Sequence, residues 1–378
     1  MGRDGSLDDL VSSLASVPPM MGETMRTERV LDDLTFWHER PVLVTGCTGL
    51  LGSWLTQTLV QASALVVGLV RDDVPQSHLV QSGIVGQIRV VRGDVTDYAT
   101  VERALNEYEI ETVFHLAAQT IVGIANRAPL STFESNIRGT WTTLEAARRS
   151  PTVRRILVAS SDKAYGTQPV LPYTEDMPLE GQHPYDVSKS AADLIARAYA
   201  TTYGLPVAVT RCANLYGGGD LNWNRLIPGT MRSALQGQPP VIRSDGSFVR
   251  DYLHVRDAVR AYIMLAEALD RDDIRGEAFN CGTDEPMSVL EMTRLILSIS
   301  PHPSLTPIVL DEVRNEIKEQ YLSSQKIRSL IGWRPGASRE DALRETMAWY
   351  AAHLDASCPV PLAVELPGPP PASRETLN

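Results

Sequence analysis

Cysteine, basic charge and long apolar runs are all scarce in this sequence of 378 residues. No run approaches the about 18 apolar residues that a bilayer-spanning helix needs, and Asp4, Asp8 and Asp9 stand where a signal peptide has basic residues. The formal net charge of −11 argues against a nucleic-acid surface, which requires a basic face. The cysteines include no C-x-x-C pair, so neither a metal site nor a disulfide framework is expected. We therefore expect a cytoplasmic protein with reduced thiols and with no nucleic-acid or membrane partner.

A strand, a glycine-rich turn and a helix are predicted in succession after residue 40. Residues 41–45 form a short apolar run, three glycines follow within residues 46–52, and a helical pattern continues through Leu59. Glycines in such a turn allow a tight bend and bring backbone N–H groups close to a pyrophosphate at the positive end of the helix. The unit predicts a dinucleotide site that contains Gly46, Thr48, Gly49, Leu50, Leu51 and Gly52.

The ends of the next apolar runs carry residues that would complete this site. Residues 64–70 end at Arg71 and Asp72, about 20 residues beyond the last glycine, where an acid holds the adenosine ribose. Asp72 favours NAD, whereas Arg71 would suit the 2′-phosphate of NADP, so NADP stays open. His115 lies inside a later apolar run, where a core histidine is more common than a catalytic one. Small and acidic residues that follow the later runs would also approach the ligand: Asp94, Val95, Ala117, Ala118 and Gln119.

Strands alternate with helical patterns from residue 41 to residue 211, including a helix expected from Asn136 to Arg149. This alternation predicts the α/β class, with a doubly wound parallel sheet (Rossmann fold) over residues 39–220. Its ligands would bind beyond the carboxyl ends of the strands. The remaining regions are an N-terminal extension (1–38) with a short helix near 27–36, a smaller substrate-binding region interleaved with the sheet (221–355), and a proline-rich, disordered tail (356–378).

The most informative segment runs from Ser160 to Lys189. It opens after an apolar run with Ser161, Asp162 and Lys163, and it closes with Tyr185 and Lys189. On a helix, the four-residue step places the Tyr185 phenol and the Lys189 ammonium on one face, about 6 Å apart at their Cβ atoms. A fixed ammonium and a cationic cofactor would favour the tyrosinate by lowering the pKa of the phenol from about 10 towards 7. An isolated Y-x-x-x-K is more often a solvated helix face, so the other motifs decide its meaning.

Together these motifs resemble the extended short-chain dehydrogenase/reductase superfamily that acts on nucleotide sugars, over about residues 36–352. The general resemblance is carried by Gly46-x-x-Gly-x-x-Gly52, His115-Leu-Ala-Ala118, Ser161, Tyr185-x-x-x-Lys189, Asn214 and Arg250-Asp-Tyr. Further segments look most like CDP-glucose 4,6-dehydratases: Phe36-Trp37, Gly52-Ser-Trp-Leu55, Ala117-Ala-Gln119, Ser161-Asp162-Lys163, Gly217-Gly-Gly-Asp220, Arg225-Leu-Ile-Pro228 and Gly332-Trp-Arg-Pro335. Two positions depart from that family. Leu51 stands where a lysine is usual, and Arg250-Asp251-Tyr252 is more typical of epimerases and other nucleotide-sugar dehydratases.

The resemblance implies a role for each matching residue. Tyr185 would take the proton of the sugar 4-hydroxyl with help from Ser161, while Asp162 would act as an acid. The cofactor would be held by the glycine turn together with Arg71, Asp72, Asp94, Val95, Ala117, Ala118, Gln119, Asn136, Tyr185 and Lys189. The nucleotide-diphosphate sugar would meet Gln119, Asn214, Arg225, Leu226 and Arg250, because an arginine can bind a phosphate in a bidentate way. A homodimer is also implied.

Three functions remain open from the sequence. A nucleotide-sugar 4,6-dehydratase would oxidise C4 and then use Asp162 and Lys163 to eliminate water across C5 and C6. Lys163 could act as the C5 base only if burial or the cofactor's charge lowers its pKa from about 10.4; otherwise it positions the substrate. A 4-epimerase on the same fold has no evident use for this pair, which favours the dehydratase. A catalytically dead, cofactor-binding scaffold is opposed by the intact Ser161, Tyr185 and Lys189.

Overall fold

The N-terminal edge of the described chain packs into the core. The structure is a computed structural model that describes residues 34–312, 317–336 and 338–356. Most of the helix expected near residues 27–36 lies outside this part, as does nearly all of the predicted tail. The last residues of the predicted N-terminal extension form the 3-10 turn η1 (Leu34–Trp37). Trp37 is fully buried there, and its indole N–H donates to Glu267 Oε1 at 2.6 Å. Trp37 therefore belongs to the core, although the sequence pattern places it in the extension.

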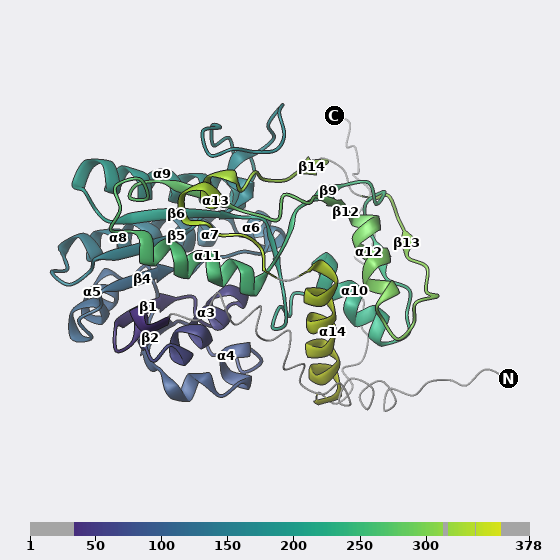
Figure 1. The fold of residues 1–378 in the computed structure, drawn as a ribbon, viewed down its shortest axis with the longest axis horizontal. Coiled ribbons are helices and arrows are strands. Elements are labelled where there is room, and N and C mark those ends of the chain that lie inside the picture. The colour runs from purple at the N-terminus through teal and green to yellow at the C-terminus, as the bar shows by residue number, and fades with distance from the viewer. Residues whose placement is uncertain (1–33, 313–316, 337, 357–378) are drawn as a thin grey trace, which may run out of the picture.

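A seven-stranded parallel sheet organises the larger part of the molecule (Figure 1). Its strand order is β11-β6-β5-β4-β1-β2-β3, and each neighbouring pair is parallel. From β1, the strands β2 and β3 are added on one side and β4, β5 and β6 on the other, so the strand order reverses at β1, as in the doubly wound fold. The predicted fold class is confirmed. The strands are β1 (Pro41–Thr45), β2 (Leu65–Val70), β3 (Arg89–Arg92), β4 (Thr112–His115), β5 (Arg155–Ala159), β6 (Val207–Cys212) and β11 (Ala278–Cys281).

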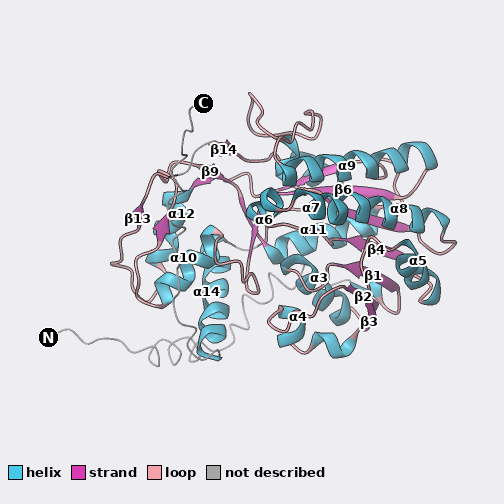
Figure 2. Cartoon of the chain, turned by 180° about the vertical axis from the view of Figure 1, so that it is seen from behind, coloured by secondary structure: helices cyan, strands magenta, loops and turns pink. Residues whose placement is uncertain are grey.

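Helices cover both faces of this sheet. Helices α3 (Leu50–Gln61) and α11 (Val255–Ala268) pack on one face, and α5 (Tyr98–Glu107), α8 (Gly139–Arg149) and α9 (Pro184–Tyr203) on the other (Figure 2). Because successive strand residues point to opposite faces, Val42 and Val44 enter the first core and Leu43 the second. Burial on both faces explains why the strands read as nearly continuous apolar runs.

Short elements connect these larger ones. The helix expected from Asn136 to Arg149 divides into a π-helical turn, η3, followed by α8. The short elements of the sheet domain are α4 (His78–Gln81), η2 (Ile84–Gln87), α6 (Val122–Arg127), α7 (Pro129–Phe133), η3 (Glu134–Arg138), η4 (Asp162–Tyr165) and α13 (Gln325–Ile331). No helix in the described ranges is both long and apolar enough to cross a membrane.

A smaller region gathers beside the sheet domain (Figure 1). Helices α10 (Leu226–Leu235), α12 (Val289–Ser298) and α14 (Arg339–Ala356) share a core that includes Met231 and Met292. Helix α10 begins at Leu226, directly after its N-cap residue Arg225. Strand β11 and helix α11 return to the main sheet from this part of the sequence, so the two regions are interleaved. The remaining pairings are β7 (Asn214–Tyr216) with β10 (Tyr252–His254), β8 (Val241–Ile242) with β13 (Ile308–Val309), and β12 (Met287–Ser288), β9 (Val249–Arg250) and β14 (Glu319–Gln320) in one small sheet.

Candidate active site

The carboxyl ends of adjacent strands bring most of the predicted site residues to one edge of the sheet. The glycine turn follows β1, Arg71 and Asp72 follow β2, and Asp94 follows β3. Residues 117–119 follow β4, and Ser161 to Lys163 follow β5. Because parallel strands end at a common edge, segments far apart in the sequence meet beside β1, where the strand order reverses. Doubly wound folds bind their ligands at this position, which we call the crevice.

The glycine turn between β1 and α3 has no room for side chains. Gly46 has a φ of 71°, and a Cβ there would lie 2.8 Å from the backbone nitrogen of Ala117. A Cβ on Gly52 would lie 2.1 Å from the carbonyl oxygen of Gly46. Gly49 is the N-cap of α3, and it offers no side-chain cap to the first turn formed by Leu50 and Leu51. Uncapped N–H groups at the start of a long helix suit a pyrophosphate, so this turn fits a dinucleotide.

The residues after β2 and β3, which the sequence predicts to hold the adenosine ribose, lie close together. The exposed Arg71 donates from Nε to Asp72 Oδ2 at 2.7 Å, and its Nη1 lies 3.8 Å from Asp94 Oδ2. Asp94 also accepts the N–H of Thr96 at 2.8 Å. Two carboxylates around one guanidinium favour ribose hydroxyls over a 2′-phosphate, whose charge they would repel. Val95, by contrast, is buried.

The loop after β4 is held by hydroxyl and amide side chains. Thr45 Oγ1 accepts the N–H groups of Leu116 and Ala117, both at 3.1 Å. Asn136 Oδ1 accepts the Gln119 N–H at 2.7 Å, and its Nδ2 donates to Gln119 O at 3.1 Å and to Ser188 Oγ at 2.8 Å. The buried Asn136 therefore joins this loop to α9, and its polar atoms are engaged by protein partners.

His115 is a core histidine, as predicted. Its Nδ1 lies 3.1 Å from Thr45 Oγ1 and its Nε2 lies 3.0 Å from Thr140 Oγ1. Burial, and to a smaller extent the charge of Lys189, lowers the pKa of His115 to about 3. The ring is therefore neutral at physiological pH and bridges two hydroxyl groups beneath the crevice.

Tyr185 and Lys189 lie in the first turns of α9, and both are buried. Lys189 Nζ donates to Ala159 O at 2.7 Å, and burial lowers the pKa of Lys189 to about 8. Burial raises the pKa of Tyr185 to about 12, while a hydrogen bond with Ser161 and the charge of Arg225 oppose this shift. The lowered pKa that the Y-x-x-x-K spacing predicts is therefore not produced by the protein alone, in which the phenol is protonated at neutral pH.

The turn after β5 places a hydroxyl beside a carboxylate. Ser161 Oγ accepts the N–H of Lys163 at 3.2 Å and donates to Asp162 Oδ1 at 3.0 Å. The same hydroxyl helps to lower the pKa of Tyr185 against the effect of burial, so it acts on both the carboxylate and the phenol. Asp162 is only 3% exposed, whereas the Lys163 side chain reaches Gln320 Oε1 on β14. Gln320 is a contact that sequence reasoning did not anticipate.

The predicted substrate residues occupy different surroundings. Asn214 Nδ2 donates to Asp251 O at 3.3 Å. Arg225 caps α10, where Leu226 begins the helix, and its Nη1 donates to Asp220 Oδ2 at 2.9 Å. The charge of Arg225 also contributes a small lowering of the Tyr185 pKa, against the larger effect of burial.

Arg250 has a different setting from Arg225. Its Nη1 donates to the carbonyl oxygens of Val249 at 2.8 Å and Lys318 at 2.9 Å, and its Nη2 donates to Ile317 O at 2.6 Å. The guanidinium predicted to bind a diphosphate therefore holds the backbone that leads into β14.

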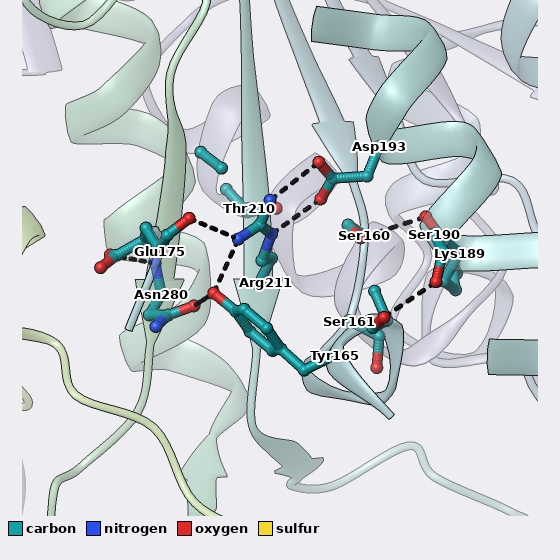
Figure 3. A network of polar contacts seen from close by, with 12 residues as sticks. Ser160, Ser161, Tyr165, Glu175, Lys189, Ser190, Asp193, Thr210, Arg211 and Asn280 are labelled. Atoms are coloured by element: carbon teal, nitrogen blue, oxygen red, sulfur yellow. Dashed lines mark hydrogen bonds and ion pairs between the residues drawn. The ribbon is translucent and has the colours of Figure 1, made fainter. Parts of the chain in front are cut away.

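A buried network behind the catalytic turn was not recognised from the sequence (Figure 3). Arg211 and Asp193 are both fully buried and form a bidentate pair, with Nε to Oδ2 at 2.8 Å and Nη2 to Oδ1 at 2.9 Å. Arg211 Nη1 also donates to the Tyr165 hydroxyl at 2.7 Å, which donates to Asn280 Oδ1 at 2.7 Å. This network connects the catalytic turn, helix α9, β6 and β11. The sequence feature that could have indicated this network is Arg211 itself, a charged residue near the end of an otherwise apolar strand.

Comparison with known proteins identifies the family. A model of the NAD dependent epimerase/dehydratase family matches residues 42–282. The chain belongs to this family. It is 29% identical over 347 residues to a CDP-glucose 4,6-dehydratase of Salmonella typhimurium, covering 85% of this chain and 93% of that relative.

Solved structures of family members include both dehydratases and epimerases. A dTDP-glucose 4,6-dehydratase of Streptomyces venezuelae with NAD bound has a TM-score of 0.74 and 28% identity, covering 84% of this chain and 98% of that one. A UDP-glucose 4-epimerase of Thermotoga maritima, solved with UDP-glucose, has a TM-score of 0.76 and 27% identity, covering 83% and 99%. NAD is thus the cofactor of this chain, and the enzyme is of the dehydratase/epimerase type.

Proposed function

We propose that the protein is a nucleotide-sugar 4,6-dehydratase, which converts an NDP-hexose into an NDP-4-keto-6-deoxyhexose. The observation that carries this proposal is the Asp162–Lys163 pair, placed directly after Ser161 and beside the Tyr185 phenol. An elimination needs an acid and a base in addition to the groups that act at C4, and this pair offers both. The similarity to a CDP-glucose 4,6-dehydratase supports a substrate of the CDP-glucose kind.

Each proton transfer of the proposed reaction can be assigned to a residue on or near the turn that follows β5. Bound NAD supplies the acceptor and later the donor of the hydride. Tyr185 takes the proton of the sugar 4-hydroxyl, and the Ser161 hydroxyl hydrogen-bonded to it steadies the phenol oxygen during that transfer. Lys163 removes the proton from C5, which the 4-ketone has made acidic. Asp162 delivers a proton to the departing C6 hydroxyl, so one water leaves. Lys163 then returns a proton to C5 while the hydride taken from C4 is added at C6, which becomes the methyl group.

Isotope labelling tests the proposed reaction. NDP-glucose is incubated with the protein in deuterated water, and the product is analysed by mass spectrometry and NMR. A 6-deoxy-4-ketosugar with deuterium at C5 is the expected product, because the C5 proton exchanges with solvent during elimination. A product inverted at C4 and free of deuterium would refute the dehydratase.

A 4-epimerase is the second candidate function. The likeness to the UDP-glucose 4-epimerase of Thermotoga maritima and the Arg250-Asp251-Tyr252 segment favour it. In that reaction Tyr185 and Ser161 would return the proton to O4 after the ketosugar has turned over, and Asp162 and Lys163 would have no proton to move. The same labelling experiment separates the two functions. A wild-type protein that binds NAD but converts no nucleotide sugar would instead support the scaffold hypothesis.

We also propose a cytoplasmic homodimer. The described cysteines, Cys47, Cys212 and Cys281, are all free thiols, which supports a reducing compartment. Large apolar side chains are exposed on the adjoining helices α7, α8 and α9: Leu130 (74%), Trp141 (45%) and Leu194 (54%). Sedimentation equilibrium would report a dimer, and Leu194→Glu would shift it towards monomer. A monomeric wild-type protein would contradict the proposal.

A further inference from the structure

We propose that Gln320 is a positioning residue for the Asp162–Lys163 pair, an inference that rests on the dehydratase function proposed above. Gln320 lies on β14 and has no exposed surface. Its Oε1 accepts a hydrogen bond from Lys163 Nζ, and its Nε2 donates to Asp162 O at 3.1 Å. One amide therefore contacts both residues that would carry out the elimination, from a position distant in the sequence.

The chemistry of the two partners determines the orientation of this amide. An ammonium can only donate a hydrogen bond, and a backbone carbonyl can only accept one. Lys163 therefore requires the Gln320 oxygen, while Asp162 O requires the Gln320 nitrogen. Rotating the amide by 180° would place donor against donor and acceptor against acceptor. Both groups of the amide are thus used, and the Lys163 amine is held at a defined place relative to the Asp162 backbone.

The segment that delivers Gln320 is anchored on both sides. Before it, Arg250 holds the carbonyl groups of Ile317 and Lys318, and β14 pairs with β9 so that Gln320 lies opposite Arg250. After it, the Tyr173 N–H donates to Tyr321 O at 2.9 Å, and the Ser323 N–H donates to Tyr173 O at 2.8 Å. This support explains what Arg250 contributes in this chain: it fixes the backbone that places Gln320 against Lys163.

A neutral acceptor has a specific advantage at this place. A carboxylate beside Lys163 would favour the ammonium form, whereas an amide oxygen orients the amine without adding negative charge. Negative charge is already close. Asp186 on α9 interacts with the charge of Lys163, although burial is the main influence on Asp186 and raises its pKa. Within the described ranges, further titratable groups around the pair include Asp162 itself, Tyr173, Tyr185 and Asp251, and the lining residues His183, Lys318 and Glu319 of a neighbouring cavity of about 470 Å³.

Two substitutions of Gln320 separate orientation from charge. Gln320→Met keeps the approximate volume but removes both hydrogen bonds. Gln320→Glu keeps an acceptor for Lys163 and adds a negative charge. Glu319→Gln is the matched control, because Glu319 is the neighbouring residue of the same strand and its side chain is exposed. Far-UV circular dichroism and thermal unfolding verify that each variant is folded.

The readouts distinguish a positioning role from a purely structural one. Reduction of bound NAD by the sugar reports oxidation at C4, and deuterium incorporation at C5 reports the elimination step. We expect Gln320→Met to lower kcat for elimination about 10- to 100-fold while KM and C4 oxidation change less than about threefold. We expect Gln320→Glu to move the acidic limb of the elimination pH profile, where activity rises as Lys163 loses its proton, upward by about one pH unit, because added negative charge favours the ammonium.

A substrate-free measurement keeps this inference separate from the proposed function. The pH dependence of Lys163 acetylation by acetic anhydride, followed by mass spectrometry, reports the titration of that amine directly. The acetylation curve should move to higher pH in Gln320→Glu, whereas Glu319→Gln, which removes an exposed negative charge on the same strand, should not move it to higher pH. Wild-type elimination by Gln320→Met, or an unshifted acetylation curve in Gln320→Glu, would overturn the role of Gln320. A wild-type protein that makes no ketosugar would refute the dehydratase instead.

Discussion

The cofactor side and the sugar side of the crevice are assembled from the chain in different ways. On the cofactor side, one seven-residue glycine-rich turn is expected to hold the pyrophosphate, and a four-residue step on α9 places Tyr185 and Lys189. On the sugar side, Lys163 meets Gln320, which is 157 residues away in the sequence. Local backbone geometry thus suffices for the first side, whereas the second exists only once distant segments pack.

The buried Arg211–Asp193 pair links these two sides. Asp193 lies on the same helix as Tyr185, and Arg211 bonds the hydroxyl of Tyr165 on the turn that carries Asp162 and Lys163 (Figure 3). A shift of α9 would therefore be transmitted to the elimination residues. Four substitutions test how separate the two sides are, beginning with the largest expected effect.

Tyr185→Phe should impair both sides at once. Removal of the phenol oxygen should lower C4 oxidation and ketosugar formation together by up to about 10⁴-fold, since elimination requires the 4-ketone. Rapid-quench kinetics with mass spectrometry measures both steps. The NAD content of the purified variant is measured as well, so that a loss of chemistry is distinguished from a loss of cofactor. Loss of elimination with intact C4 oxidation would contradict the role assigned to Tyr185.

Arg211→Met should destabilise the fold by about 3–5 kcal/mol, because Asp193 would remain buried without its partner. Urea unfolding followed by circular dichroism measures the change in the free energy of unfolding. The double variant Arg211→Met/Asp193→Leu should recover much of the loss, since both charges are then removed. A double variant less stable than the single one would show that the pair itself provides the stability.

Asp162→Asn should separate the two sides. The amide cannot donate a proton to the departing hydroxyl as a carboxylic acid does, so ketosugar formation should fall about 10²- to 10³-fold. C4 oxidation, which depends on Tyr185 and Ser161, should remain within a few-fold of the wild type. Single-turnover absorbance of reduced NAD and product analysis measure the two steps. An equal loss in both would mean that the sides are not separable at Asp162.

Asp251→Asn should change the pH dependence of stability on the sugar side. Burial raises the pKa of Asp251 from 3.8 to about 6, although its hydrogen bonds with Thr283 oppose this shift. The unfolded carboxyl ionises first as pH rises from about 4 to about 6, so Asp251 should reduce the free energy of unfolding across this window by up to about 3 kcal/mol. The asparagine variant should lack this loss. Parallel wild-type and variant curves between pH 4 and pH 6.5 would contradict the assignment.

Much of the cofactor side could be predicted from the sequence, because its motifs involve residues only a few positions apart. The turn from Gly46 to Gly52 needs its glycines for contacts with backbone only a few residues away or on the next strand. Asp72 and Ser161 follow apolar runs, so their place at the strand ends was predictable from periodicity alone. The pKa of Tyr185 was not, because burial raises it and the Y-x-x-x-K spacing contains no information about burial.

Residues whose partners are distant were harder to interpret. Arg250 was assigned to the diphosphate from its motif, yet its guanidinium holds the carbonyl groups of residues 317 and 318. Cys212 and Cys281 appear unrelated in the sequence but are register partners on β6 and β11. Neither contact leaves a pattern in the nearby sequence, since each depends on which strands become neighbours in the folded chain.

For this protein, the sequence by itself determined the alternation of strands and helices, the glycine cradle and the order of catalytic groups at the strand ends. Those features follow from side-chain periodicity and from steric limits within a few residues. Only the tertiary structure decided that Gln320 reaches Lys163, that Arg250 supports β14 and that Arg211 pairs with Asp193 inside the core. The physical reason is that a buried polar group must find a partner, and the folded chain rather than the local sequence determines which partner lies within hydrogen-bonding distance.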